Sequence, residues 1–161
     1  MTLEELAYIS QIVGVVAVFA SLIFVGLQIR QNTLALKATS HHAITDSFNV
    51  INTLIMSDPK VARRWRLGMA GAPGLDEDEQ SSIDMMMLGY MRVFETLYYQ
   101  YKSGTMEAKL FEAELKTLKW TVTNPGFHVW WPNNPISLSV EFRAFIDGLI
   151  RDAQHDGGDR K

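Results

Sequence analysis

The sequence contains no cysteine among its 161 residues. That absence excludes a disulfide framework, a thiol nucleophile and a metal site built from thiolates. Helix-breaking residues are also scarce early in the chain, because neither proline nor glycine occurs between Gly26 and Asp58. A helix that begins near the amino terminus can therefore continue for a long way without a break.

Charged residues are missing from one long stretch. No Asp, Glu, Lys or Arg lies between Glu5 and Arg30, which leaves 24 uncharged residues at positions 6–29. As a helix this stretch would measure roughly 36 Å, and the hydrocarbon core of a bilayer needs about 30 Å. Apolar residues occupy every side of that helix, and a chain of this length offers little protein to surround it. The stretch predicts a transmembrane helix over 6–29.

A cleaved signal peptide is the alternative for the same stretch. Such a peptide begins with basic residues and has a shorter apolar run before its cleavage site, whereas this chain begins with the acidic MTLEE. We therefore expect an uncleaved anchor in the cytoplasmic membrane. Arg30 and Lys37 follow the span while Glu4 and Glu5 precede it, so the positive-inside rule places residues 1–5 outside the cell and the rest of the chain in the cytoplasm.

The helical pattern continues beyond the predicted span. One face with alternating spacings of four and three residues predicts an amphipathic helix. Its members are Lys37, His41, Ile44, Phe48, Ile51 and Ile55. We therefore predict one helix over about 6–57, half in the membrane and half in water.

Local signals divide the remaining chain into about four further helices. Asp58 with Pro59 and Asp76 with Glu79 predict helix starts, and Gly104 predicts a left-handed helix end. The predicted segments are 59–70, 76–103, 106–123 with Thr105 as its cap, a short turn of helix through 125–131, and a last helix capped by Ser137 or Ser139. This all-α prediction gives a cytoplasmic helical bundle over 30–154 and a disordered tail over 155–161.

Several segments together resemble a widespread group of small uncharacterised bacterial proteins. These segments are an apolar amino-terminal helix running into QIRQNT (28–33), then FETLYYQYKSG (94–104), a Trp-rich loop, and EFRAFID (141–147). The resemblance covers most of the chain in order. It implies one amino-terminal transmembrane helix followed by a helical domain, and it supplies no catalytic residue and no ligand.

The histidines do not form a metal-binding pattern. His41 and His42 are adjacent and point about 100° apart on a helix, so they cannot easily share one metal ion. His42 and Asp46 could supply half of a site, but nothing nearby in the sequence completes it. The chain also has no nucleophile-elbow or phosphate-loop motif. We therefore predict no metal, no cofactor and no enzyme activity.

The basic segment VARRWRLG has two functional interpretations and a structural one. Arg63, Arg64 and Arg66 with Trp65 could contact nucleic acid or a membrane surface. A single short cluster in an acidic domain is a weak case for either partner. We expect Trp65 to pack on the first helix and the arginines to face water or the acidic turn at 76–79, and we predict no nucleic acid partner.

The strongest candidate site surrounds Glu95. This carboxylate lies in an apolar stretch, and a buried carboxylate needs a partner. Arg92 at i−3 and Arg143 on the last helix are the candidates for a buried ion pair. The alternative is a small polar pocket lined by Glu95, Tyr99, Trp131 and Arg143.

Two further features point to the bilayer. Tyr98, Tyr101 and Lys102 resemble the aromatic and basic belt found at membrane interfaces, although ordinary core tyrosines would give the same pattern. Small residues recur in the span with spacings of 4, 3 and 4, and such a stripe lets two membrane helices approach closely. The members of this helix-association stripe are Ser10, Gly14, Ala17 and Ser21.

Taken together, these features predict a membrane-anchored helical interaction protein without catalysis of its own. It would associate with itself or act as an accessory subunit of a larger membrane complex, so its expected partners are the lipid bilayer and a second copy or another membrane protein. The alternative is a ligand-binding or sensory domain, with a small pocket between the 76–103 helix, the Trp-rich loop and the last helix.

Overall fold

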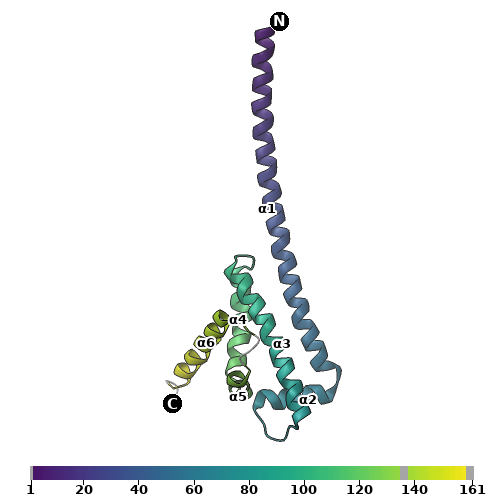
Figure 1. Ribbon diagram of the computed structural model, residues 1–161, viewed down its shortest axis with the longest axis vertical. Helices are drawn as coiled ribbons and strands as arrows, with labels where there is room; N and C mark the ends of the chain where they lie inside the picture. The colour runs from purple at the N-terminus through teal and green to yellow at the C-terminus, as the bar shows by residue number, and fades with distance from the viewer. Residues whose placement is uncertain (1, 135–137, 159–161) are drawn as a thin grey trace. The chain divides into compact units, whose positions relative to one another are not determined.

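The computed structural model describes residues 2–134 and 138–158 (Figure 1). Over these residues the chain forms six helices and no strand, which confirms the all-α prediction. The helices are α1 (Leu3–Ser57), α2 (Pro59–Ala70), α3 (Glu77–Lys102), α4 (Ala108–Val122), α5 (Pro125–Asn133) and α6 (Val140–Gly158). The chain divides into two compact units, Met1–Thr39 and Ser40–Lys161, and α1 contributes to both.

The first unit consists of the apolar part of α1. This helix is long and apolar enough to cross a membrane, with a mean hydropathy of 2.6 over an 18-residue window in which no residue is buried. Large apolar side chains are exposed on every side of it, and Phe19, Ile23 and Phe24 are each at least 60 % exposed. The chain is thus a helical protein with one candidate transmembrane helix near its amino terminus.

The last part of α1 packs in the second unit through the predicted face. Ile44 is buried and Phe48, Ile51 and Ile55 are partly buried, whereas Val50 on another side of the helix is 68 % exposed. The ring of Phe48 packs edge to face with Phe94 of α3 at a centroid distance of 5.1 Å. The three-four spacing therefore identified the side of α1 that packs against the bundle.

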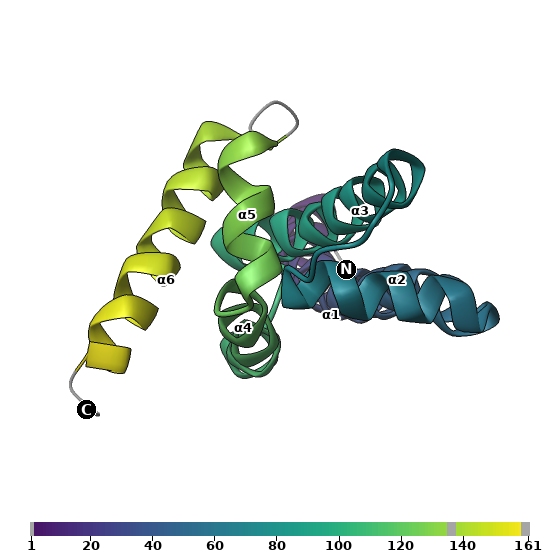
Figure 2. The same ribbon diagram turned by 90° about the horizontal axis from the view of Figure 1, so that it is seen from below.

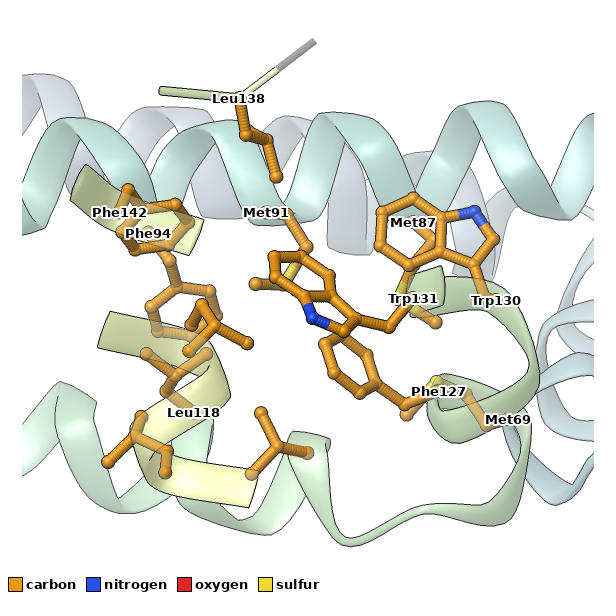
Figure 3. Packing of buried hydrophobic residues seen from close by; sticks show 13 residues of the cluster. Met69, Met87, Met91, Phe94, Leu118, Phe127, Trp130, Trp131, Leu138 and Phe142 are labelled. Atoms are coloured by element: carbon orange, nitrogen blue, oxygen red, sulfur yellow. The ribbon is translucent and has the colours of Figure 1, made fainter. Parts of the chain in front are cut away.

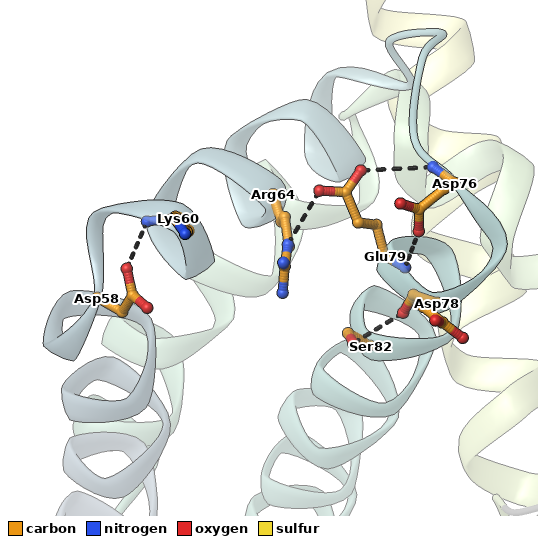
Figure 4. A network of polar contacts seen from close by, with 7 residues as sticks. All are labelled: Asp58, Lys60, Arg64, Asp76, Asp78, Glu79 and Ser82. Carbon is orange, nitrogen blue, oxygen red and sulfur yellow. Dashed lines mark hydrogen bonds and ion pairs between the residues drawn. The ribbon is translucent and has the colours of Figure 1, made fainter.

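Two predicted helix starts are confirmed, at the amino-terminal ends of α2 and α3 (Figure 4). The Asp58 side chain accepts the backbone N–H of Lys60 at 2.8 Å. At α3 the reciprocal capping box is complete, because Asp76 accepts the N–H of Glu79 at 2.8 Å and Glu79 accepts the N–H of Asp76 at 3.4 Å. Glu79 also accepts a hydrogen bond from Nε–H of Arg64 at 3.1 Å. The acidic turn therefore caps α3 and also binds α2.

Three other boundaries differ from the prediction. The N-cap of α4 is Glu107, which makes no side-chain cap bond. Thr105 lies two residues before that cap, and its hydroxyl donates to the carbonyl of Gln100 in α3 at 3.1 Å. The predicted short turn of helix begins at Pro125 as expected and is longer, since α5 has nine residues and ends at Asn133. Five helices follow α1 in the described ranges. The helix α6 continues to Gly158 through the start of the predicted disordered tail, with His155 in its last turn. A basic side chain there interacts favourably with the helix dipole. Residues 159–161 of the predicted tail, and the candidate cap Ser137, lie outside the described residues.

The helices α2, α3, α4, α5 and α6 share one core of aromatic and aliphatic side chains (Figure 3). Phe94, Phe127 and Phe142 are at most 1 % exposed, and they come from α3, α5 and α6. Trp130 and Trp131 are also buried, and Trp131 stacks on Phe127 at 5.4 Å. Burial of a large apolar side chain contributes about 1.5–3 kcal/mol, so these residues dominate the packing of the second unit. The core fixes how α3, α5 and α6 meet.

The helices α2 and α5 cross with their backbones in contact, and glycines make this approach possible. A Cβ atom added to Gly126 would overlap the carbonyl oxygen of Gly68 and lie 2.8 Å from the carbonyl carbon. Gly71 ends α2 with φ 61°, in the left-handed conformation that glycine adopts without strain. Seen from below, α5 lies beside α6 and α2 lies on the other side of α5 (Figure 2).

Candidate functional site

Glu95 binds the beginning of α6. Its carboxylate oxygen accepts the backbone N–H of Ser139 at 2.7 Å, and Ser139 is 44 positions further along the chain. The hydroxyl of Ser139 in turn accepts the N–H of Phe142 at 3.3 Å, which is the usual bond of an N-cap. A carboxylate placed at a helix amino terminus is favoured by the helix dipole and by the charge on the hydrogen bond.

Further residues of α3 hold the same turn of α6. Tyr99 donates its hydroxyl proton to Oγ of Ser139 at 2.9 Å, and Lys102 forms an ion pair with Glu141. The ring of Tyr98 packs on Phe145 of α6 at a centroid distance of 4.8 Å. These α3 residues follow the spacing i, i+3, i+4 and i+7 from Glu95 and therefore share one helix face.

The ion pair at this contact between α3 and α6, the α3–α6 junction, shifts the pKa values of both its members. The hydrogen bond to Glu141 raises the pKa of Lys102, and the same bond lowers the pKa of Glu141. Both side chains are exposed to solvent, so screening by water and salt leaves the pair with little effect on stability. The pair orients the start of α6 more than it stabilises it.

A second polar group lies where α5 meets α6. Trp131 donates its indole N–H to Asp147 at 2.7 Å, and the guanidinium of Arg143 lies 4.5 Å from the centre of the Trp131 ring. Arg143 and Asp147 are one turn apart on α6, so together they fix the buried indole from two directions. Nη1 of Arg143 is itself buried and has no hydrogen-bond partner among the described residues.

The structure separates the residues that the sequence grouped around Glu95. The described ion pairs are Arg64–Glu79 and Lys102–Glu141, so Glu95 meets a backbone N–H of α6 in place of the guanidinium that the sequence suggested. Arg92 is exposed and lines a different groove with Ile44 and Gln100. Glu95 and Tyr99 share Ser139 as a partner, whereas Trp131 and Arg143 belong to the α5–α6 contact.

The tyrosines at the end of α3 have different surroundings. Tyr98 is partly buried against Phe142 and Phe145 of α6. Tyr101 is 42 % exposed and stacks on Phe111 of α4 at 4.1 Å with the rings nearly parallel. Contact of Tyr98, Tyr101 or Lys102 with a bilayer stays a prediction.

The small residues of the first unit lie on α1 and are exposed. No atom within 4 Å would contact a Cβ added at Gly14. The hydroxyl of Ser10 donates to the carbonyl of Leu6 at 2.8 Å, within its own helix. Ala17 and Ser21 complete the stripe, whose role in association stays a prediction.

Sequence reasoning missed one groove in the second unit. It has a volume of about 350 Å³, and polar side chains form most of its lining. The lining residues are Thr45, Phe48, Asn49, Asn52, Tyr90, Glu114 and Thr117. The sequence signal was weak, because Thr45, Asn49 and Asn52 are three of many polar residues along this part of α1, and Glu114 is one of two glutamates on α4.

The polar groups of the α3–α6 junction are committed to helix contacts. The Glu95 carboxylate and the Ser139 hydroxyl are both used in capping α6. Within residues 2–134 and 138–158, no three His, Asp or Glu side chains gather as a metal site would require. The junction as described can hold two helices together, and its chemistry is that of hydrogen bonding.

The fold and these contacts define a helical protein with one candidate membrane-spanning helix and a separate helical bundle. Comparison of the chain with protein-family models, with curated proteins and with solved structures found no match.

Proposed function

We propose that this protein is a membrane-anchored interaction protein, with α1 crossing the cytoplasmic membrane and the second unit in the cytoplasm. The exposed apolar part of α1 carries the proposal, because no residue of its most apolar 18-residue window is buried within the chain. Transfer of such a surface from water to lipid is favourable at about 25 cal/mol per Å² of apolar area. An anchor therefore accounts for an apolar surface that the chain itself leaves uncovered.

Association is the activity that best fits the rest of the molecule. The second unit has its own core, and the polar groups at the α3–α6 junction serve to hold helices together. The small-residue stripe on α1 supports close approach of another membrane helix. We propose that the partner is a second copy or another membrane protein, and that the protein has no catalytic activity of its own.

Topology is the direct test of the anchor, and the absence of native cysteine makes it simple. Single cysteines would be introduced as Thr2→Cys and Gln154→Cys, both at exposed positions. With an impermeant thiol reagent on intact cells, we expect labelling at position 2 and none at position 154, while permeabilised cells label at both. The reverse pattern would overturn the orientation.

A cleaved signal peptide is distinguished from an anchor by a second experiment. The mature protein would lose the first residues, and intact mass spectrometry of the membrane fraction would show the shorter chain. We expect the full-length mass and retention in the membrane pellet after alkaline extraction. A shortened chain released by that extraction would contradict the anchor.

A ligand-binding or sensory role is the alternative, and one observation favours it. Nη1 of Arg143 is buried beside Trp131 without a hydrogen-bond partner among the described residues, and an unpaired buried donor is costly. A ligand acceptor at this position would satisfy it. Density next to Arg143 in an experimental map of the purified protein would favour the sensory role over the interaction role.

A further inference from the structure

We propose that the groove between α1, α3 and α4 binds a small organic cation that carries a primary ammonium group. The groove is lined by Thr45, Phe48, Asn49, Asn52, Tyr90, Glu114 and Thr117. All of these residues belong to the second unit, so the inference goes beyond membrane anchoring and does not depend on it.

The charge of the groove comes from one carboxylate. Glu114 is partly buried, and the ion pairs found in the described ranges, Arg64–Glu79 and Lys102–Glu141, do not involve it. Its neighbours one turn away on α4 are uncharged, and the groove residues from α1 and α3 are neutral. A partly desolvated carboxylate without a cationic partner favours a positively charged ligand.

The other polar groups in the groove match an ammonium group. An ammonium ion has three N–H donors and no acceptor. Glu114 offers carboxylate oxygens, and Asn49 and Asn52 on one side of α1 offer amide oxygens. Together these acceptors can satisfy three donors around one positive charge, whereas an anion would be repelled by Glu114.

The remaining lining favours an organic cation over a metal ion. Phe48 and Tyr90 line the groove and pack edge to face at a centroid distance of 5.7 Å. Aromatic rings contact methylene groups favourably and attract alkylammonium ions. A divalent metal ion prefers several oxygen ligands with more than one carboxylate, and no metal-binding cluster of His, Asp and Glu occurs in the described parts of the chain.

The size of the groove limits the ligand. Its volume of about 350 Å³ lies at the lower end of the usual range for small-molecule sites, about 300–1,000 Å³. A short aliphatic amine or diamine fits this volume. We choose putrescine as the probe, with butanediol and succinate as probes of the same chain length that are neutral and anionic.

The test is isothermal titration calorimetry on the full-length chain in a non-ionic detergent. Saturable binding of putrescine to the wild type is expected, with no measurable binding of butanediol or succinate. Glu114→Gln should weaken binding by about tenfold or more, because the negative charge that pairs with the ammonium group is lost. Asn52→Ala should weaken it less, by about threefold or more, because one uncharged acceptor of the ammonium group is lost.

Glu112→Gln is the matched control. It removes the same charge from the same helix at an exposed position that does not line the groove, and binding should stay within about twofold of wild type. Equal losses in both Gln variants would show attraction by net charge and would overturn the site. Absence of saturable putrescine binding to the wild type, or equal binding of butanediol, would overturn it as well.

Discussion

At the scale of single residues, Glu95 performs a task that α6 cannot perform for itself. In α3 the third helical residue, Glu79, reaches back to the N–H of its own cap, Asp76. In α6 the equivalent position is occupied by Phe142, whose side chain has no hydrogen-bond acceptor. The carboxylate of Glu95 on α3 takes that place and accepts the N–H of Ser139. The cap of α6 is therefore also a tertiary contact.

Removal of the Glu95 carboxylate should destabilise the second unit. We expect Glu95→Ala to lower the free energy of unfolding by about 1–3 kcal/mol, because a charge-assisted bond to a helix start is lost. Glu95→Gln keeps an acceptor oxygen and should cost less. Denaturant unfolding of the full chain in non-ionic detergent, followed by tryptophan fluorescence, measures both. With the exposed Glu112→Ala as the control, equal stability of Glu95→Ala and wild type would contradict the capping role.

At the scale of helices, the crossing of α2 and α5 depends on the absence of side chains. Gly68 and Gly126 bring the two backbones into contact, and Gly71 at the end of α2 has φ 61°. Pro125 occupies the first position of α5, where its missing N–H costs nothing. The chain therefore turns into α5 at the point where α2 passes closest.

A methyl group at this crossing should force the helices apart. We expect Gly126→Ala to lower the free energy of unfolding by about 2 kcal/mol or more, since the contacting group is rigid backbone. Gly89→Ala is the control within α3, where a Cβ would meet no atom within 4 Å. That variant should be stabilised by about 0.5–1 kcal/mol through helix propensity. Thermal unfolding of both variants tests this difference, and a Gly126→Ala protein as stable as Gly89→Ala would refute it.

Local and distant interactions differ in how well the sequence predicts them. The caps at Asp58 and Asp76 and the left-handed Gly104 were predicted correctly, because each depends on residues within one helical turn. Thr105 was assigned wrongly, since α4 begins later, at Ala108 after the cap Glu107, and the loop before it has no strong start signal. The partner of Glu95 could not be predicted, because a backbone N–H has no sequence signature. The groove around Glu114 was missed for a related reason, since three distant helices form it.

At the scale of the whole molecule, the exposed apolar helix is the feature on which the proposed association depends. Lipid tails are as apolar as the side chains of α1, so helix association in a membrane depends on close packing. The spacing of the small residues corresponds to a left-handed crossing near +20°. The stripe from Ser10 to Ser21 places four small, exposed residues on one side of the apolar part of α1.

Bulky residues in the stripe should reduce association without damage to the single chain. Gly14→Ile with Ala17→Leu keeps the helix apolar, and a Cβ at Gly14 meets no atom within 4 Å. We expect a wild-type oligomer and a smaller species for the double variant by light scattering in mild detergent, with a matching loss of crosslinking in native membranes. A wild type that is monomeric in both assays would contradict the proposal. Equal assembly of the double variant would also contradict it.

The capping of α6 by Glu95 has a consequence for synthesis. The ribosome completes α3 before any residue of α6 exists, so the acceptor is in place when the last helix emerges. Until then Met91 and Phe94, which are at most 1 % exposed in the finished protein, lack the neighbours that α6 provides. The helix α6, like most helices in proteins, gains most of its stability from packing of its apolar face. We therefore expect α6 to pack last. A chain truncated before residue 139 would lack Phe142 and Ile146, and its core would stay exposed.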